Sequence, residues 1–262
     1  MQGAAPDRIP LTEIVTELDT LLRLADFPGD YSHNGLQVEG AHRGVAKICF
    51  GVDASPEFYA EALRRGADLL VVHHGISWGD SLNRIASANY QLVAPLIQAD
   101  AALYGAHLPL DAHPVVGNNA RLAAAIGLQD LRPFAVYHGY AIGMKGVFPE
   151  ALPWSEVLDR LRRACPDGDF RHVDFGPALV RSVGVVSGGG ADEFPQAVDE
   201  GLDAFITGEI HLQDYTALQT RPIHFAAAGH YATERFGVQA LAEHLAKRFG
   251  VECEFIDFHL PY

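Results

Sequence analysis

The chain has 262 residues and a formal net charge of −14 at pH 7, with its 13 histidines counted as neutral. This acidic balance argues against non-specific binding to nucleic acid or to anionic membranes, both of which favour Lys/Arg patches. No apolar run approaches the roughly 18 to 20 residues that span a bilayer. Residues 1–7 lack the pattern of a signal peptide, and the three cysteines are widely spaced, so we expect a cytoplasmic protein with isolated thiols.

The first half of the chain alternates between helical and strand patterns. Apolar residues at helical spacing open it, and Ser55-Pro56 and Gly66 have the residue types of a helix N-cap and C-cap. We expect, in chain order, a helix at 11–25, a polar loop at 28–40, a strand at 48–52, a helix at 55–66, a strand at 69–72, a helix at 88–98 and a strand at 101–105.

The second half repeats this plan after a less regular stretch. Residues 131–180 contain one clear helix, at 154–164, and a short strand pattern at 142–148. The elements expected beyond it are a strand at 183–186, a helix at 192–200, a strand at 204–207, a short helix near 215–218, a strand at 224–227 and a long helix at 234–249.

Two stretches match closely between the halves: residues 65–70 (Arg-Gly-Ala-Asp-Leu-Leu) and residues 200–205 (Glu-Gly-Leu-Asp-Ala-Phe). A duplicated strand–helix–strand unit explains this match, and chance similarity between two such units is the alternative. Alternating strands and helices predict an α/β fold with mainly parallel sheets. We expect two repeats, 1–130 and 131–262, with residues 225–262 packing back on the first.

Polar segments follow four of the predicted buried strands, where ligands gather in open α/β sheets. They are Val72-His73-His74-Gly75, the segment from His107 to Asp111, Glu209-Ile210-His211, and the segment from His230 to Glu234. Neutral imidazole and carboxylate together suit Zn, Mn, Fe or Ni. The pattern predicts a site for two divalent metal ions, at the carboxyl ends of the strands and between the repeats.

Several roles follow from spacing. His107 and Asp111 share the His-x3-acid spacing of His230 and Glu234, so the two acids are candidates to bridge two metals. Glu234 as a plain acid at a helix N-terminus is the alternative. The adjacent His73 and His74 can both face the site if the backbone turns at the strand end; one core and one surface histidine is the other interpretation.

Three further residues are candidates for catalysis. By the repeat, His107 is either a further ligand or a residue that supports ligands or carries protons. Glu209 and His211 occupy the place of the histidine pair in the second repeat and suit acid–base work. The glycines after Ser187 could bind phosphate on backbone N–H groups, but a tight turn is the preferred interpretation because the G-x-G-x-x-G pattern is not met. Asn118 or Asn119 would cap a helix from residue 120.

These strings resemble a known family. Together with residues 32–38 (Ser-His-Asn-Gly-Leu-Gln-Val), the histidine motifs look like the YbgI type of dinuclear-metal proteins, commonly labelled GTP cyclohydrolase type 2 homologues, over nearly the whole chain. The resemblance implies two intertwined α/β/α repeats and a toroidal homohexamer whose metal sites face an internal cavity. It implies two metal ions per chain, with these ligands: His73, His74, Asp111, His230 and Glu234.

The leading prediction is a metal-dependent hydrolase of a small-molecule substrate, in which His107, Glu209 or His211 moves protons. Hydrolytic opening of the GTP ring is one candidate reaction, beside hydrolysis of phosphoesters, amides or peptides. The alternative is a non-enzymatic metal-binding ring that traffics metal or acts as a scaffold. A ring around DNA is disfavoured by the acidic charge.

Overall fold

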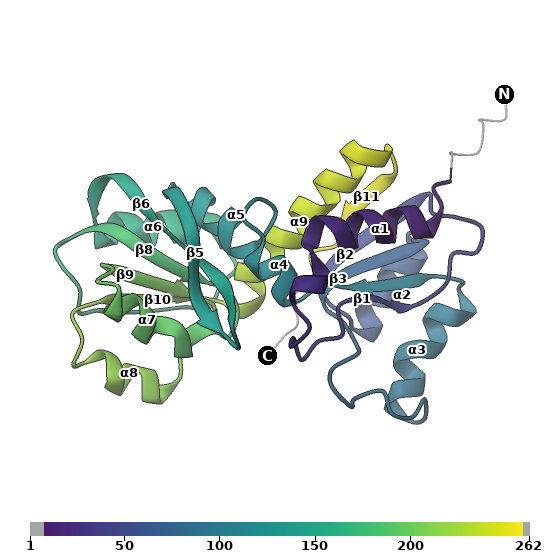
Figure 1. The fold of residues 1–262 in the computed structure, drawn as a ribbon, viewed down its shortest axis with the longest axis horizontal. Coiled ribbons are helices and arrows are strands. Elements are labelled where there is room, and N and C mark those ends of the chain that lie inside the picture. Colours follow the sequence, from purple (N-terminus) through teal and green to yellow (C-terminus); the bar gives the residue numbers. More distant parts are fainter. Residues whose placement is uncertain (1–7, 259–262) are drawn as a thin grey trace. The chain divides into compact units, whose positions relative to one another are not determined.

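The computed structural model describes residues 8–258, so the expectation about a signal peptide concerns residues outside the described part. It is an α/β protein of two compact units (Figure 1). Unit 1 comprises Met1–Pro109 and Val238–Tyr262, and unit 2 comprises Leu110–Gly237. Within residues 8–258, no helix is both long and apolar enough to cross a bilayer. The division of the sequence into two repeats at residue 131 stays a prediction.

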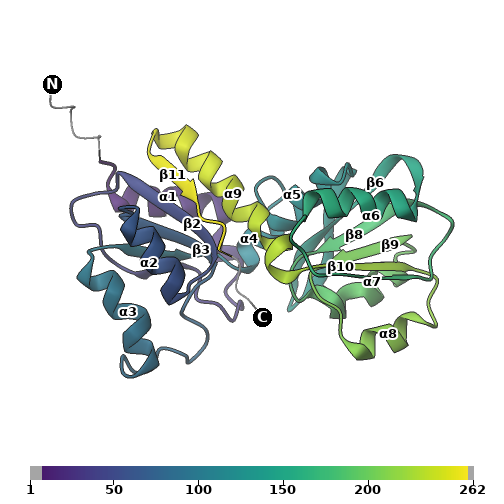
Figure 2. The same ribbon diagram turned by 180° about the vertical axis from the view of Figure 1, so that it is seen from behind.

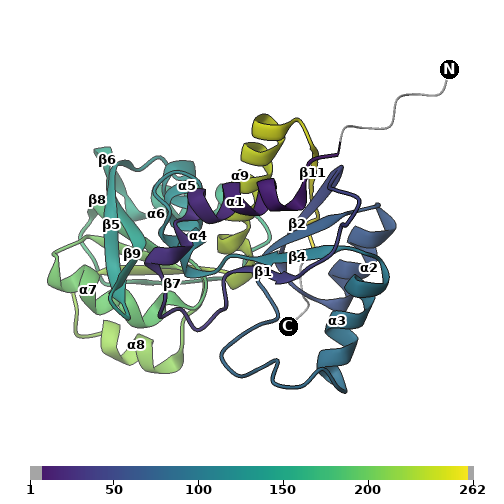
Figure 3. The ribbon, with the colours of Figure 1, turned by 45° about the vertical axis from the view of Figure 1, so that its right-hand side comes forward.

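Unit 1 is built on a five-stranded sheet with the order β1-β4-β3-β2-β11. The strands are β1 (Gly35–Val38), β2 (Lys47–Asp53), β3 (Leu69–His74), β4 (Ala102–Gly105) and β11 (Glu252–Phe255). Three pairings are parallel, and β1 joins β4 in antiparallel fashion (Figure 3). The central strands are almost wholly buried, which explains their continuous apolar sequence.

Helices cover both faces of this sheet. The amphipathic helix α1 (Leu11–Leu22) lies in front of it in Figure 1, and α2 (Pro56–Arg64) lies in front of it in Figure 2. The helix α2 packs with α3 (Ala88–Gln98) on one apolar core, through Phe58, Tyr59 and Leu96 among others. Ser55 caps α2 by accepting the Phe58 N–H, as its sequence position predicts.

Unit 2 is built on a six-stranded sheet with the order β5-β6-β8-β9-β10-β7. The strands are β5 (Gln129–Tyr137), β6 (Tyr140–Pro153), β7 (Phe170–Asp174), β8 (Leu179–Val186), β9 (Ala204–Thr207) and β10 (His224–Ala228). The three strands β8, β9 and β10 are parallel, and the outer pairings are antiparallel. The fold class expected from the sequence, α/β with mainly parallel sheets, is confirmed.

The helices of unit 2 also lie on both faces of its sheet. One core contains α5 (Asn118–Ala125) and α6 (Trp154–Ala164), the helix across the front of the sheet in Figure 2. On the other face, Phe194 of α7 (Phe194–Asp199) packs on Phe225 of β10. The remaining helical segments are α4 (Leu108–Ala112), α8 (Leu212–Leu218), α9 (His230–Phe249), η1 (Leu24–Asp26) and η2 (Gly190–Glu193).

The two matching sequence stretches occupy equivalent places in the two sheets. Asp68 precedes β3 and accepts the backbone N–H groups of Ala46 and Lys47 at 2.8 and 3.2 Å. In unit 2, Asp203 precedes β9 and accepts the N–H groups of residues 181 and 182, both at 2.9 Å. Each aspartate follows a glycine with positive φ, +82° at Gly66 and +69° at Gly201. A carboxylate, buried at Asp68 and half-buried at Asp203, therefore fixes the start of the middle strand in both units.

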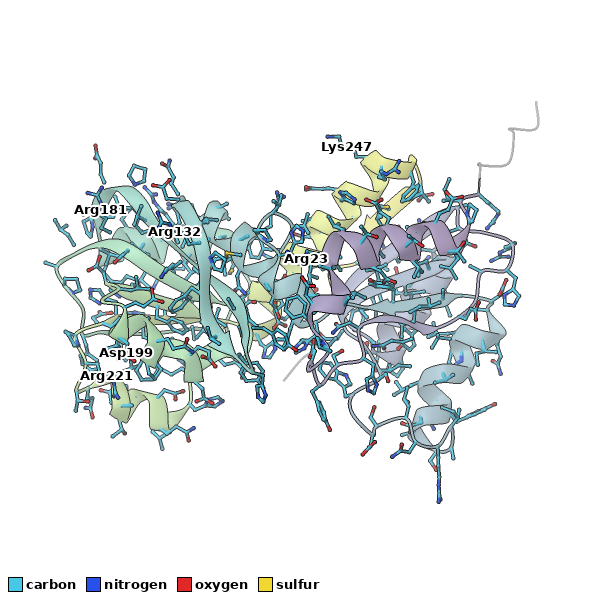
Figure 4. The ribbon with its side chains drawn as sticks, in the orientation of Figure 1. Arg23, Arg132, Arg181, Asp199, Arg221 and Lys247 are labelled. Atoms are coloured by element: carbon cyan, nitrogen blue, oxygen red, sulfur yellow. The ribbon has the colours of Figure 1, made fainter. Side chains whose placement is uncertain are left out.

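Basic side chains are spread over exposed parts of many elements. Figure 4 labels Arg23 after α1, Arg132 on β5, Arg181 on β8 and Lys247 on α9. The arginines of α6 are paired with acids on the same helix: Arg160 with Glu156, and Arg162 with Asp159. The arginines of α6 therefore belong to a charged helix face with its own acidic partners.

Candidate metal-binding groups

The end of β3 brings two histidines to the edge of the sheet of unit 1. His73 is fully buried and donates from Nδ1 to the carbonyl oxygen of Ala106 at 2.8 Å. The side chain of His74 is 21% exposed, and its Nδ1 lies 2.8 Å from Oδ1 of Asp53, the residue opposite it on β2. Because each Nδ1 faces an oxygen that accepts, the neutral form of either imidazole has its lone pair on Nε2.

His107 follows β4 and is held in the same way. Its Nδ1 lies 2.9 Å from Oδ1 of Asp30, and its backbone N–H donates to Oδ1 of Asn34 at 2.7 Å. Burial opposes ionisation of Asp30, but hydrogen bonds from His107, Asn34 and Ser32 outweigh it and lower the pKa of the carboxyl group. Asp30 is therefore an ionised, buried acceptor that sets the orientation of His107.

The three histidines of unit 1 form one group. Each offers a nitrogen, and these nitrogens all lie within 4.8 Å of one another. The ring centroids of His73 and His107 are 5.3 Å apart, and those of His73 and His74 are 4.5 Å apart. Three imidazoles with the same orienting hydrogen bond on Nδ1 make a donor set that suits a first-row transition metal or zinc.

A close contact with Gln37 explains why a glycine, Gly75, follows the histidine pair. A Cβ at this position would lie 2.2 Å from Oε1 of Gln37. That oxygen accepts the backbone N–H groups of Ile76 and Ser77 at 2.7 and 3.3 Å, while Gln37 Nε2 donates to the carbonyl of His33 at 2.8 Å. Gln37 therefore joins the loop before β1 to the loop after β3, beside the histidine group.

In unit 2, His230 lies between two carboxylates. Its Nδ1 is 2.7 Å from Oε1 of Glu209, and its Nε2 is 3.2 Å from Oε2 of Glu234, one helical turn further along α9. Burial disfavours the charged imidazole, but hydrogen bonds and charge attraction from Glu234 and Glu209 prevail and raise its pKa to about 9. The two carboxylates thus favour the protonated form of this imidazole.

Asp111 is a second buried carboxylate of unit 2. Its Oδ1 accepts from Asn118 Nδ2 at 2.9 Å and from the hydroxyl of Ser187 at 3.2 Å. The neighbouring Asn119 accepts the N–H of Ser187 at 2.6 Å and donates to the carbonyls of Asp111 and Ile142. The expectation that Asn118 or Asn119 caps a helix is wrong, because α5 begins at Asn118 and both amides bind around Asp111 instead.

The loop after β8 approaches the carboxylate of Glu234. Gly188 has φ +61°, and a Cβ there would lie 2.0 Å from Glu234 Oε1 and 3.0 Å from His230 Nε2. Its N–H donates to the hydroxyl of Thr233 at 3.0 Å. The glycines after Ser187 therefore let the backbone pass close to these side chains. This agrees with the interpretation of the segment as a tight turn.

A second glycine contact shapes the start of α9. Gly229 has φ +90°, and a Cβ there would lie 3.0 Å from the Cα of Gly168. Conversely, a Cβ at Gly168 would lie 1.9 Å from the carbonyl oxygen of Ala228. The turn that places His230 thus needs the absence of side chains on both sides of the contact.

His211 lies further out in the same unit. Its side chain is 50% exposed, with Nε2 at 4.0 Å from Glu209 Oε2 and Nδ1 at 3.3 Å from the buried carboxylate of Asp214. Asp214 also accepts the backbone N–H of His211 at 2.7 Å at the start of α8. His211 is thus an accessible base whose carboxylate neighbour Glu209 touches His230.

The sequence-predicted residues of unit 1, His73, His74 and His107, form one group. In unit 2, His230 contacts Glu209 and Glu234, and His211 lies beside Glu209. Asp111 accepts hydrogen bonds from Asn118 and Ser187 instead. Sequence reasoning missed Asp30, Asp53 and Gln37, which orient the histidines or their loops. Their signal was available in part, because Asp53 ends the strand beside β3 and a parallel neighbour places its side chain against His74.

Comparison with known proteins finds relatives that are similar to this chain over nearly its whole length. A family model described as Duf34/NIF3 (NGG1p interacting factor 3) matches residues 9–261. A protein of Halobacterium salinarum named GTP cyclohydrolase 1 type 2 homolog is 40% identical over 248 residues, covering 94% of this chain and 97% of the relative. A Deinococcus radiodurans protein of the same name is 41% identical over 94% of this chain and 92% of its own length.

Solved structures agree with these relatives. The structure of the protein ybgI, whose function is given as unknown, superposes with a TM-score of 0.89 at 36% identity, covering 97% of this chain and all of the other. A structure from Thermus thermophilus has a TM-score of 0.87 at 38% identity and the same coverage. The fold and the sequence motifs thus point to one group of relatives.

Proposed function

We propose that this chain, which belongs to the Duf34/NIF3 family, binds two divalent metal ions and uses them to catalyse a hydrolysis. The observation that carries the proposal is the shared orientation of the histidines. His73, His74 and His107 each direct Nδ1 to an oxygen acceptor and bring their ligand nitrogens within 4.8 Å of one another. Histidines in ordinary surface positions have no need of three such supports.

The proposed ligands are His73 and His74 from unit 1, and Asp111, His230 and Glu234 from unit 2. Their assignment to one shared centre rests on the resemblance of the motifs. The residues within each unit suit this role: histidine nitrogens in unit 1, and in unit 2 two buried carboxylates, of which Glu234 lies beside His230. Asp111 and Glu234 are the candidates to bridge, because a carboxylate has two oxygens to share.

Bound divalent ions would supply Lewis acidity, which polarises a carbonyl or phosphoryl group and lowers the pKa of a bound water. The chain's own residues have separate tasks. Asp30, Asp53 and Glu209 orient imidazoles, and His211, half exposed and 4.0 Å from Glu209, is placed to accept or return a proton at Nε2. His107 is either a further ligand or a second proton carrier.

The class of substrate follows from the names of relatives only in outline. Those names suggest hydrolytic opening of the GTP ring as one candidate reaction. Phosphoesters and amides are the other candidates, since the same polarising chemistry serves all three. The metal is one of Zn, Mn, Fe or Ni, because imidazole and carboxylate accept each of them.

Metal stoichiometry is the experiment that tests the proposal. Elemental analysis of the wild-type protein is expected to give about two ions per chain. His73→Ala and Glu234→Ala are each expected to lose metal, while the control His42→Ala, whose side chain is 80% exposed, keeps it. If each variant lost only one ion and left the other intact, separate sites would replace the shared centre. No uptake of any of the four metals by chelated and reconstituted protein would overturn the proposal.

Turnover separates the enzyme from its rival, a non-enzymatic metal-binding ring in trafficking or scaffolding. With the preferred metal bound, GTP, phosphoesters and amides are the substrates to screen, and Asp111→Ala should abolish any activity found. Bound metal without turnover on any of these would favour the carrier or scaffold.

We also infer a homohexamer in the cytoplasm, on the basis of the family resemblance and the sequence composition. Analytical ultracentrifugation of the full chain tests the assembly. A sedimenting mass about six times that of the 28.4 kDa chain is expected. A monomer or dimer at micromolar concentration would contradict the hexamer without affecting the metal proposal.

A further inference from the structure

The two framework aspartates, Asp68 and Asp203, use one carboxylate oxygen in the same way. Oδ2 of Asp68 accepts the backbone N–H groups of residues 46 and 47, and Oδ2 of Asp203 accepts those of residues 181 and 182. In unit 2 the hydroxyl of Ser182 also donates to Oδ2, at 3.0 Å. These bonds define which residues of the two units correspond to each other.

The other oxygen, Oδ1, differs between the units. Oδ1 of Asp68 accepts from the guanidinium groups of Arg8 and Arg43, at 3.1 and 3.2 Å. Oδ1 of Asp203 has no hydrogen-bond or ion-pair partner in the described part of the chain, since all its bonds go to Oδ2. Unit 1 therefore neutralises its carboxylate with its own arginines, and unit 2 does not.

The correspondence of residues explains this difference. Three residues before 46 and before 181 stand Arg43 and Ala178. The antiparallel bridge between residues 9 and 45 corresponds to the pair 152 and 180 of β6 and β8. The residues that precede 9 and 152 are Arg8 and Ala151. Unit 2 thus has alanine at both positions from which unit 1 supplies an arginine.

A cavity of about 360 Å³ lies beside Asp203, which is the only ionisable residue among those that line it. The walls are apolar and include Phe175, Pro177, Val198, Leu202 and Ile223. The loop that carries Pro177 is fixed by His224, whose Nε2 donates to the carbonyl of Pro177 at 2.8 Å. The cavity therefore combines one carboxylate with a fixed apolar wall.

A neighbouring cation of the chain is bound elsewhere. Arg221, directly before the lining residue Pro222, donates to the carbonyl of Ala217 at 2.7 Å and stacks on the ring of Phe194. Its guanidinium forms no ion pair with Asp203 in residues 8–258. The charge of Asp203 is thus left for a group from outside the chain.

We propose that this cavity binds the arginine side chain of a partner polypeptide, with its guanidinium on Oδ1 of Asp203. The charges are complementary, and the same oxygen of Asp68 already binds guanidinium groups. The aliphatic stem of an arginine suits the apolar walls. The partly exposed rings of Phe175 and Tyr215, with centroids 6.1 Å apart, offer further apolar surface for the polypeptide around that arginine.

Saturation-transfer NMR with N-acetyl-arginine methylamide tests the cavity. We expect saturable binding to the wild-type protein, and no binding of the citrulline analogue, which has a similar shape without the charge. Asp203→Asn should weaken binding about tenfold, the scale of one lost charge-assisted hydrogen bond. The control Asp199→Asn removes an exposed carboxylate from α7 beside Val198 (Figure 4) and should leave the affinity unchanged.

Ala178→Arg is a second test, which removes no contact of Asp203. It restores the residue that unit 1 has at this position, so we expect its guanidinium to occupy Oδ1 of Asp203. Binding of the probe should then be lost, and the midpoint of thermal unfolding should rise. Ala178→Gln, with a polar but uncharged side chain, should leave both close to their wild-type values.

Three results would overturn the inference. The first is equal binding of the arginine and citrulline probes, or undiminished binding of the arginine probe by Ala178→Arg. The second is tighter binding of agmatine than of the capped arginine, since the cavity would then serve a free small molecule. The third is loss of binding on chelation of metal. The cavity residues precede β8, β9 and β10, whereas the candidate metal ligands follow strand ends, so binding should not depend on metal.

Discussion

Unit 1 and unit 2 present polar side chains from the same framework but with different chemistry. In both, an aspartate fixes the start of the middle strand, and this strand pairs in parallel with its neighbours. Counting along β3 and β9 from these aspartates places His74 and Glu209 at equivalent positions. His74 is oriented by a carboxylate, Asp53, whereas Glu209 is itself the carboxylate that orients His230.

The residue on the neighbouring strand, opposite His74 or Glu209, also differs between the units. Asp53 at the end of β2 corresponds to Gly188 after β8, where a side chain would collide with Glu234. Both units thus contain a pair of histidine and carboxylate, but the pair comes from β2 and β3 in unit 1 and from the residues after β9 and β10 in unit 2. The framework therefore fixes where a candidate metal-binding group forms, and the individual positions decide whether nitrogen or oxygen predominates.

The largest expected effect comes from Gly188→Ala, which would break the unit 2 arrangement. Its Cβ would collide with the Glu234 carboxylate on a backbone with φ +61°, so we expect a loss of about 2 to 4 kcal/mol in unfolding free energy, together with loss of bound metal. Chemical denaturation and metal analysis measure both. The control Gly139→Ala, with φ +90° and no atom within 4 Å, should cost only about 1 kcal/mol and keep its metal. Equal losses in the two variants would show that the close contact is unimportant.

The next effect tests the shared framework. Asp68→Asn and Asp203→Asn each weaken hydrogen bonds from two backbone N–H groups, so we expect each to lower the unfolding free energy by about 1 to 3 kcal/mol at pH 7. Calorimetry or urea denaturation measures this. A neutral outcome in one unit only would contradict the equivalence of the two aspartates.

Asp68 also gives a pH dependence. Burial opposes its ionisation, but hydrogen bonds from Ala46, Arg8 and Lys47 outweigh this and lower its pKa from the ordinary value of 3.8. Because the folded pKa lies below the unfolded one, its contribution is fully present above about pH 4 and is lost as the pH falls through the folded pKa. The stability difference between wild type and Asp68→Asn should therefore shrink in acid.

A smaller effect, on metal affinity, is expected from replacing the carboxylates that orient the histidines, Glu209 and Asp53. Glu209→Gln and Asp53→Asn keep the size of the side chain but remove the charge that supports an imidazole, so each should weaken metal binding about tenfold. Competition with a chromophoric chelator measures the affinity. Asp174→Asn, which changes a carboxylate beside the exposed His172, is the control and should have no effect. Unequal losses would show that one unit dominates the affinity.

The smallest effect concerns the glycines before the framework aspartates. Gly66→Ala and Gly201→Ala meet no atom within 4 Å, but both have positive φ, so only the backbone conformation resists the change. We expect about 1 kcal/mol of destabilisation for each. Thermal unfolding of the two variants should give similar shifts, and a clear difference would mean that the turns are not equivalent.

The sequence predicted the central strands and most of the helices because their signals are local. Buried parallel strands are continuous apolar runs, and α2 has a proper cap. The edge strand β1 was expected to be loop, and β7 and β11 were not foreseen, since these short strands depend on backbone pairing with distant strands rather than on a pattern of their own. The long helix α9 begins at His230, four residues before its expected start.

The candidate site shows the same limit. The histidines and acids were visible because several lie close together in the sequence. Asp30 was not, because it lies 77 residues before the imidazole that it orients. The motif at 32–38 stands beside it, but a local pattern does not show that Asp30 faces His107. The amides of Asn118 and Asn119 were assigned to a helix cap for a similar reason: local pattern favours the cap, whereas the folded chain supplies Asp111 as a better partner.

The contact between Gly168 and Gly229 bears on how such sequences diverge. Either glycine alone can be replaced only if the backbone opposite moves away, and that movement would shift the turn before His230. Among relatives that keep the histidine, the two positions should therefore covary, with both glycines retained or both lost in a single rearrangement of the turn. In relatives that changed only one of the two glycines, we expect the turn to have moved and His230 to be displaced from its position between Glu209 and Glu234.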